Sequence, residues 1–313
     1  MKRLILSIVA SLACFSLSAW GFYAHKLINE HAVYSLPPPL SIFFKEHRKL
    51  IREKAINADK RCYTDSLEPP RHYIDLDRYE KSIVDNIPLY WSKAREKYGE
   101  RQLRKHGIVP WQIQITYQQL VQAFIKNDAA QIINKAADIG HYIADAHVPL
   151  HTTMNYNGQL TGQMGIHSFW ESRLPEQFAK SYKLAVGRAT YIENTQELAW
   201  TIVHESNALV EEVLEIEKEL SKTFPSSMQK SYINRANITI LTYSDAYAHA
   251  YHERLKGMVQ ARLRLSIQRI ASYWYSAWVD AGQPILRSGY KEPTAASEKK
   301  VLDRKILGRE EWH

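Results

Sequence analysis

The apolar residues of this chain recur with helical spacing over most of its length. In residues 195–222 they fall at positions i, i+3 and i+4, and acidic residues fill the opposite face. Alternation with a period of two is almost absent, and no hairpin signal is apparent. The pattern therefore predicts an all-α fold with a single multi-helix domain. We expect helices at about 25–34, 41–56, 89–105, 109–126, 129–148, 167–184 and 195–222, and a long helical stretch, broken once, at about 228–281.

Polar, proline-rich or glycine-rich segments separate these predicted helices. We expect residues 57–71 to form a polar loop and residues 72–77 a short irregular piece. Residues 152–165 contain three glycines and little apolar content, so we expect a mobile loop that borders the functional site. Residues 289–313 are polar and charged and are expected to form a tail. The chain has no repeats, no glycine-rich phosphate loop and no GxSxG elbow.

The amino-terminal segment has the pattern of a secretory signal. A basic pair, Lys2 and Arg3, precedes an apolar run that ends at Leu17 and is too short for a comfortable membrane span. Small residues follow, and we expect cleavage after Ala19. The processed protein would then be exported to the periplasm or the medium and would begin at Trp20, with residues 20–288 as its domain.

Cysteine content and charge fit an exported protein with an anionic substrate. Cys14 leaves with the signal, so the processed chain keeps Cys62 alone and no intrachain disulfide can form. A lipoprotein signal at Cys14 is the alternative, but the residues before it fit that signal poorly. The formal net charge of +8 becomes +6 after loss of Lys2 and Arg3. This charge suits nucleic acids or phospholipids, and it equally suits a basic surface that keeps the protein soluble.

The stretch IGHYIADAHVPLH, residues 139–151, carries the candidate chemistry. His141 and Asp145 are four residues apart, so on a helix they share one face and can hold one metal ion. The proline at 149 ends the helix, which leaves His151 free to point back at the same place. His167 and Glu171 repeat the four-residue spacing. Imidazole and carboxylate ligands suit Zn²⁺ or a related divalent ion, and the sequence therefore predicts a multinuclear metal site.

These motifs resemble those of the zinc-dependent phospholipase C and single-strand nuclease superfamily. The phospholipase signature is approached closely by residues 141–155, HYIADAHVPLHTTMN, with Ala144 where the family usually has Gly or Thr. The change at Ala144 removes no ligand. The resemblance covers residues 20–281, and it implies an all-α fold built around three zinc ions.

The resemblance also implies which residues hold each ion. One zinc would be held by Asp59, His72, His141 and Asp145. A second would be held by His151, His167 and Glu171, with water in its remaining positions. A third would be held by the free α-amine and carbonyl oxygen of Trp20, by His25 and by the shared Asp145. An uncut chain has no free amine at Trp20, so cleavage directly before this residue would be required for the third ion.

The activity that the resemblance implies is hydrolysis of a phosphodiester or phosphomonoester without a covalent protein intermediate. Zinc brings a bound water to a pKa of about 7, so hydroxide is available to attack phosphorus. Asp59 is expected to orient or deprotonate that water. Candidate substrate contacts are Tyr23, Lys60, Arg61 and Asn155.

The sequence leaves the substrate open between two branches. Asn155 and the glutamate at 171 resemble the phospholipase branch, and the spacing from Trp20 to His25 resembles the nuclease branch. Tyr23 replaces the acidic residue of choline-selective phospholipases, which argues against choline selectivity. We favour a phospholipase C with peripheral membrane contact and no obligate protein partner, ahead of a single-strand nuclease acting on single-stranded nucleic acid. A non-catalytic, metal-stabilised binding protein is a third hypothesis.

Other histidines and aromatic residues have simpler interpretations. His147 faces away from the ligand row and is expected to pack or to support a ligand. His249 and His252 are expected at the surface or at the edge of the core. The aromatic residues 273–278 are spaced as in a helix and are expected in the core.

Overall fold

A computed structural model of the chain describes residues 21–79, 87–235, 238–286 and 289–290. The predicted signal, the Trp20 ligand and most of the predicted tail lie outside these residues. Within them the predicted all-α fold is confirmed, because helices dominate and the strands amount to a single hairpin. No helix among them combines the length and the apolar character that a membrane span requires.

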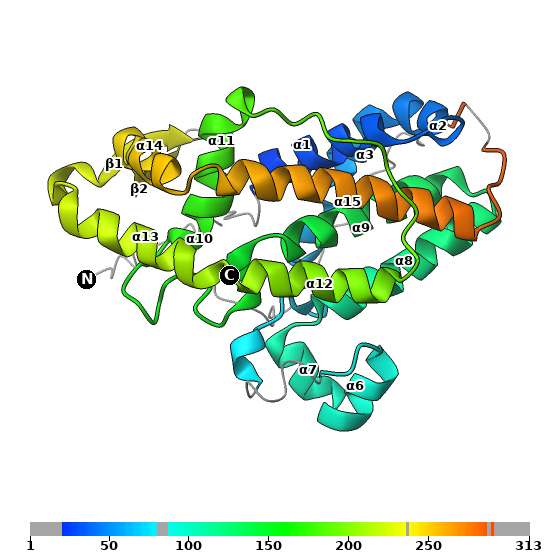
Figure 1. Cartoon of the computed structure of the whole chain (residues 1–313), viewed down its shortest axis with the longest axis horizontal. Helices are drawn as coiled ribbons and strands as arrows, with labels where there is room; N and C mark the ends of the chain where they lie inside the picture. Colours follow the sequence, from blue (N-terminus) through cyan, green and yellow to red (C-terminus); the bar gives the residue numbers. More distant parts are fainter. Residues whose placement is uncertain (1–20, 80–86, 236–237, 287–288, 291–313) are drawn as a thin grey trace, which may run out of the picture.

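Two long helices form the centre of the fold. Helix α8 (Val109–Ile125) packs against α9 (Ala129–Ala146), and α9 carries the predicted metal motif. Around them lie α1 (Phe22–Ala32), α3 (Arg48–Lys54), α12 (Thr195–Asn207) and α15 (Met258–Asp280), each of which contacts α9 (Figure 1). Helix α9 is therefore surrounded by protein on most of its surface.

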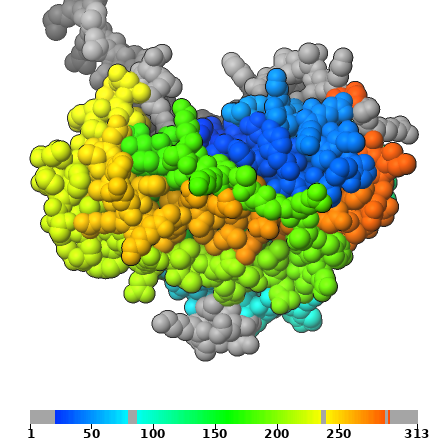
Figure 2. Space-filling view, turned by 45° about the horizontal axis from the view of Figure 1, so that its top comes forward, coloured from blue at the N-terminus to red at the C-terminus, as the bar shows by residue number. Residues whose placement is uncertain are grey.

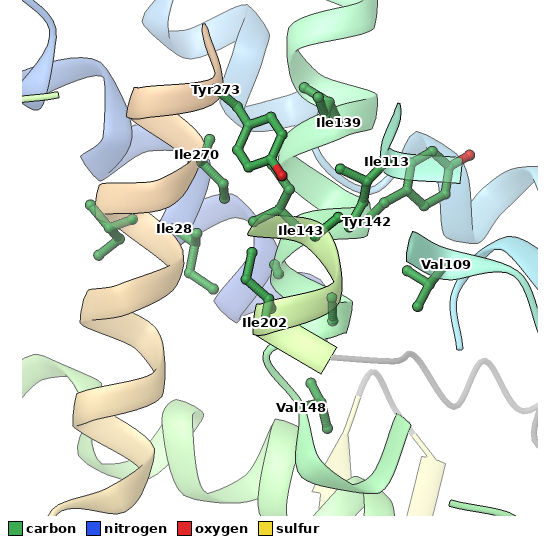
Figure 3. Close-up of a cluster of buried hydrophobic side chains, with 14 of the residues drawn as sticks. Ile28, Val109, Ile113, Ile139, Tyr142, Ile143, Val148, Ile202, Ile270 and Tyr273 are labelled. Atoms are coloured by element: carbon green, nitrogen blue, oxygen red, sulfur yellow. The ribbon is translucent and has the colours of Figure 1, made fainter. Parts of the chain in front are cut away.

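The sequence explains why α9 begins and ends where it does. The Asp128 carboxylate accepts a hydrogen bond from the backbone N–H of Gln131, which caps the first turn. Val148 is extended and Pro149 opens a 3₁₀ turn, η4 (Pro149–Thr152), so the helix cannot continue. Apolar residues of α9 such as Ile139 and Ile143 lie in the core beside Ile28, Ile202 and Ile270 (Figure 3).

Gly140 allows α1 to approach α9 closely. A Cβ atom at this position would lie 2.1 Å from the side-chain oxygen of Asn29 on α1. The Asn29 amide donates to the backbone carbonyl of His25 on the preceding turn. A larger residue at 140 would displace the Asn29 side chain or push the two helices apart.

Several predicted helices are divided. The predicted helix at 41–56 consists of α2 (Leu40–Glu46) and α3, which meet at His47. The predicted helix at 89–105 consists of α6 (Trp91–Tyr98) and α7 (Glu100–His106), because Gly99 has a φ of 76° that ends the first. The predicted helix at 195–222 consists of α12 and α13 (Val210–Thr223). Apolar periodicity continues across such short breaks, so the spacing alone does not reveal them.

Smaller differences lie next to the site. The predicted loop at 57–71 contains the short helix α4 (Asn57–Arg61) and a 3₁₀ turn, η2 (Pro69–Arg71); residues 76–78 form η3 (Leu76–Arg78). Helix α1 starts three residues earlier than predicted and continues into η1 (Val33–Ser35). The segment predicted as one helix at 167–184 is α10 (Ile166–Ser168), a π-helical turn η5 (Phe169–Arg173), α11 (Leu174–Phe178) and η6 (Ala179–Ser181).

The prediction of a helical stretch at 228–281 without a hairpin is wrong at its start. After η7 (Ser226–Met228), strands β1 (Lys230–Arg235) and β2 (Ile238–Tyr243) pair antiparallel, with Tyr232 opposite Leu241. Both of these side chains are exposed, and Ile233 and Ile240 on the other face are half-buried. Apolar residues on both faces conceal the alternation that identifies a strand. The helices that follow are α14 (Asp245–Arg254) and α15.

Candidate metal centre

Eight of the nine predicted ligands lie in the described residues, and the structure brings all eight into three neighbouring groups. The groups are His25, His141 and Asp145; Asp59, His72 and His141; and His151, His167 and Glu171. Within each group the nitrogen and oxygen atoms that could bind an ion lie within 4.8 Å of one another. Every member is buried.

Helix α9 provides His141, which the first two groups share, and Asp145 of the first group. His141 Nε2 lies 3.2 Å from an Asp145 carboxylate oxygen one turn later, as the four-residue spacing predicts. The same nitrogen lies 3.4 Å from Asp59 Oδ1 and 3.0 Å from His72 Nδ1. His141 thus faces potential metal-ligand atoms from α4 and from the segment after η2.

His25 reaches the centre from α1. Its ring stacks on that of His141 with 3.8 Å between centroids, and its Nε2 lies 3.3 Å from Asp145 Oδ1. This stacking depends on the close approach of α1 and α9 at Gly140. The backbone N–H of Gly21 donates to Ser172 Oγ in η5, so the chain enters α1 beside the turn that carries Glu171.

His72 is fixed by backbone hydrogen bonds on both sides. The N–H groups of Ile108 and Val109 donate to the carbonyls of Pro70 and Tyr73, and the N–H of Ile74 donates to the carbonyl of His151. His72 Nδ1 points at Asp145 Oδ2, 2.9 Å away. These hydrogen bonds fix the irregular segment that contains His72 and so position the His72 imidazole.

The third group is built from the end of the motif and the π-helical turn. His151 Nε2 and His167 Nε2 lie 3.2 Å and 3.0 Å from the same oxygen of Glu171. The insertion of a π turn places Glu171 toward the histidines of this group. His151 Nδ1 lies 3.9 Å from Asp145 Oδ1, so this group adjoins the other two.

Hydrogen bonds to the backbone set the tautomers of two histidines. His141 Nδ1 lies 2.8 Å from the Ala55 carbonyl, and His151 Nδ1 lies 2.7 Å from the His72 carbonyl. A carbonyl can only accept, so each Nδ1 carries a proton, and each Nε2 faces its group, where it can bind a metal ion in place of a proton. Metal-binding histidines are oriented in this way in proteins.

The electrostatics of the centre favour bound positive charge. Burial lowers the pKa of His141, but the carboxylates of Asp145 and Asp59 outweigh burial and raise it to about 10. Burial raises the pKa of Glu171, but His167 and His151 lower it to about 2. Burial and the adjacent His141 lower the pKa of His25, which keeps that imidazole neutral. Burial raises the pKa of Asp145, but His141 and the neighbouring histidines outweigh burial and lower it, so Asp145 and Glu171 stay ionised in a buried space.

The donors present fit divalent metal ions. Both carboxylate oxygens of Asp59, both ring nitrogens of His25 and Asp145 Oδ1 are buried and have no hydrogen-bond partner among the described residues. Buried polar atoms without partners are costly, and a bound cation would satisfy them. Imidazole nitrogens and carboxylate oxygens are ligands that Zn²⁺ accepts in a tetrahedral or open site.

Sequence reasoning missed the residues behind His72. Its Nε2 lies 3.7 Å from Glu68 Oε1 and 3.5 Å from Cys62 Sγ. Glu68 is fully buried and also accepts from Tyr142, Arg61 and Arg71. Burial raises the pKa of Glu68, but His72 and the two arginines outweigh it and lower the pKa, so Glu68 stays ionised and can fix His72. Burial raises the pKa of the Cys62 thiol.

The four residues predicted to contact the substrate differ in burial and in their hydrogen-bond partners. Asn155 is buried, and its amide bonds with Leu160 and Thr161 inside the loop. Arg61 donates to Asp138 and Glu68 on the far side of His72. Lys60 is exposed and Tyr23 is half-buried.

The glycine-containing loop 152–165 borders the third group. The ring of Tyr156 lies against His167 with 5.8 Å between centroids. The loop was expected to be mobile, but the structure fixes it through many hydrogen bonds: Gln163 alone donates to the Leu214 carbonyl and to Glu217. The loop thus forms a fixed wall of the site.

The simpler interpretations of the remaining residues are confirmed. His147 Nδ1 donates to the Ile143 carbonyl, and its Nε2 accepts from Arg269, so it has no nitrogen left for a metal. His249 is exposed. Tyr273, Trp274 and Trp278 are buried in the core.

Comparisons with known proteins give distant structural likeness alone. No protein-family model matches the chain, and no curated protein matches it. Among solved structures, the alpha-toxin from Clostridium absonum aligns with a TM-score of 0.47 at 13% identity, over 85% of this chain. The Clostridium perfringens alpha-toxin from avian strain SWCP aligns with a TM-score of 0.46 at 12% identity, over 84% of this chain. The chain spans 64% of the length of each toxin chain. A functional assignment therefore rests on the geometry of the centre.

Proposed function

We propose that this chain is an exported, zinc-dependent phosphoester hydrolase of the phospholipase C type. The observation that carries the proposal is the convergence of five imidazoles and three carboxylates from α1, α4, α9, η4, α10, η5 and the segment after η2 on one buried centre. A structural zinc site needs four protein ligands and no more. A centre of this size with shared ligands is typical of multinuclear sites that hydrolyse phosphoesters.

Three zinc ions would be held as the sequence motifs suggest. Asp59, His72, His141 and Asp145 would hold one, and His151, His167 and Glu171 would hold another. Trp20, through its free amine and carbonyl, His25 and Asp145 would hold the third. Bound zinc supplies Lewis acidity and water of lowered pKa at neutral pH.

The residues of the chain then have separate tasks. The backbone carbonyls of Ala55 and His72 hold the lone pairs of His141 and His151 toward the centre. Glu68 holds His72 from behind. Asp59, whose two oxygens have no hydrogen-bond partner among the described residues, would orient an attacking water or accept its proton. The burial of all three groups excludes bulk water, which strengthens the interactions with a developing negative charge.

An apolar rim beside the centre favours phospholipid as the substrate. The loop that contacts His167 carries Leu160 and Met164, which are 62% and 53% exposed. Nearby, the hairpin carries Tyr232 and Leu241, which are 74% and 55% exposed. The hairpin ends at Tyr243, which stacks on Phe169 of η5. In Figure 2 the hairpin region (yellow) and the amino-terminal helices (blue) lie on either side of residues around α11 (bright green). Apolar side chains around a polar centre suit a lipid headgroup with its acyl chains alongside.

Activity assays on the processed chain test this proposal. The protein is incubated with phospholipid vesicles or with single-stranded DNA, each with and without a chelator, and its zinc content is measured. We expect release of a phosphorylated headgroup from the vesicles, loss of that activity with chelator, and bound zinc before chelation. Cleavage of DNA alone would make the protein a nuclease. A chelator-sensitive melting temperature without turnover of either substrate would identify a metal-stabilised binding protein.

A further inference from the structure

A cavity of about 420 Å³ lies apart from the three metal-binding groups. Helices α6 and α7 project from the bundle (Figure 1), and the cavity lies between this projection and α8 and α9. Its volume falls within the range of small-molecule sites. None of the residues that line it belongs to the metal-binding groups; they are Arg61, Arg71, Trp91, Arg104, Ile108, Gln112, Ile115, Thr116, Gln119, Lys135, Asp138 and Tyr142.

Four basic side chains and one carboxylate, Asp138, line this cavity. Arg61 and Arg71 both contact the buried Glu68; Arg61 also pairs with Asp138, and Arg71 lies 3.7 Å from the partly exposed Asp65. The other two basic residues, Arg104 and Lys135, have weaker partners. Glu100, which pairs with Arg104, is partly exposed and therefore screened by solvent. Lys135 shares Asp138 at 3.8 Å.

Two of the three guanidinium nitrogens of Arg104 have a hydrogen-bond or ion-pair partner. Its Nε and Nη2 bond to Glu100, at 2.8 Å and 2.7 Å. Its Nη1 is buried and has no hydrogen-bond partner among the described residues. The guanidinium also lies 5.8 Å from the centroid of the Trp91 ring, which fixes its plane at the cavity wall.

We propose that this cavity is a binding site for a small phosphate-containing anion. Arg104 and Lys135 supply the charge, and the planar fork of an arginine matches the oxygens of a phosphate. Trp91 and the half-exposed Ile115 give an apolar wall for an organic substituent on the phosphate. The site adds to the proposed hydrolase function without depending on it, because Arg104 and Lys135 belong to none of the three metal-binding groups.

Calorimetric titration of the metal-loaded full chain tests this site. The probes are inorganic phosphate and phenyl phosphate, with sodium chloride at equal ionic strength as the reference. The variants are Arg104→Gln and Lys135→Gln, and the matched control is Lys105→Gln, which removes the same charge from an exposed neighbour on α7. We expect each cavity variant to weaken binding by about tenfold or more, as loss of a charge-assisted hydrogen bond does, and the control to bind as the wild type does.

The outcomes separate this proposal from the proposed activity. Tighter binding of phenyl phosphate would identify an organic phosphomonoester as the ligand class, and equal binding would identify free phosphate; both support the site. Absence of binding, or binding that neither cavity variant weakens, overturns it, because the anion would then sit at the metal centre or on the surface. Circular dichroism shows whether each variant folds, and Lys135→Gln, at a partly exposed position, serves if Arg104→Gln does not. A protein without phosphoester turnover could still pass this test.

Discussion

Replacement of Gly140 by alanine should separate α1 from α9 and weaken the metal centre. Alanine in a helix interior normally stabilises by about 1 kcal/mol relative to glycine. Here the new Cβ would lie 2.1 Å from Asn29 Oδ1, whereas ordinary contacts begin at 3.4 Å, a shortfall of 1.3 Å. Overpacking of this kind costs about 1–3 kcal/mol, and rotation of Asn29 would also remove its bond to the His25 carbonyl, worth about 1 kcal/mol.

The expected result is a lower free energy of unfolding and weaker metal binding. After subtraction of the helix-propensity gain, we expect Gly140→Ala to lose roughly 1–3 kcal/mol in urea unfolding of the metal-free chain. Because a shift of α1 moves His25 away from His141, zinc affinity should also fall, measured by competition with a chelator. Gly187→Ala is the control, since a Cβ there meets no atom closer than 4.0 Å.

A double-mutant cycle identifies the clash as the cause. The three atoms nearest the added Cβ all belong to the Asn29 side chain, so Asn29→Ala removes them. The double variant Gly140→Ala/Asn29→Ala should be about as stable as Asn29→Ala alone, which gives a coupling energy of about 1–3 kcal/mol. Additive effects, or a Gly140→Ala variant more stable than the wild type, would refute the reasoning.

Three further predictions concern the centre and its surroundings. Glu68→Gln should lower zinc affinity by about 10- to 100-fold, because His72 loses the carboxylate that orients it, and unchanged affinity in a chelator competition would exclude this role. Glu171→Ala should remove one zinc per chain by elemental analysis and abolish turnover, while Glu219→Ala, at an exposed helix position, should change neither. The paired change Tyr232→Ser and Leu241→Ser should reduce vesicle binding in a sedimentation assay and leave hydrolysis of a soluble phosphodiester intact; equal binding by wild type and variant would remove the hairpin from the lipid surface.

Local spacing was enough to predict helix α9, its ligands His141 and Asp145, and His151 just after its end. Helical period and Pro149 predict the limits of this helix within two residues of those observed. Once the helix is given, the four-residue spacing places His141 and Asp145 on one face, and the turn at Pro149 returns His151 to it. These relations are set by bonds and torsions within about fifteen residues, so the sequence shows them directly.

The tertiary structure decided everything that depends on contact between distant segments. Asp59, His72 and His25 were predicted through resemblance alone, because no local pattern says that α4, the segment after η2 and α1 meet at α9. Glu68 was missed because its role depends on lying behind His72 with two arginines and Tyr142, and its sequence context is an ordinary polar loop. The hairpin was missed because apolar residues on both of its faces concealed the alternation. Sequence periodicity indicates which face of a helix or strand is apolar. Only tertiary packing decides which buried polar atoms come into contact and whether an exposed apolar face has a partner.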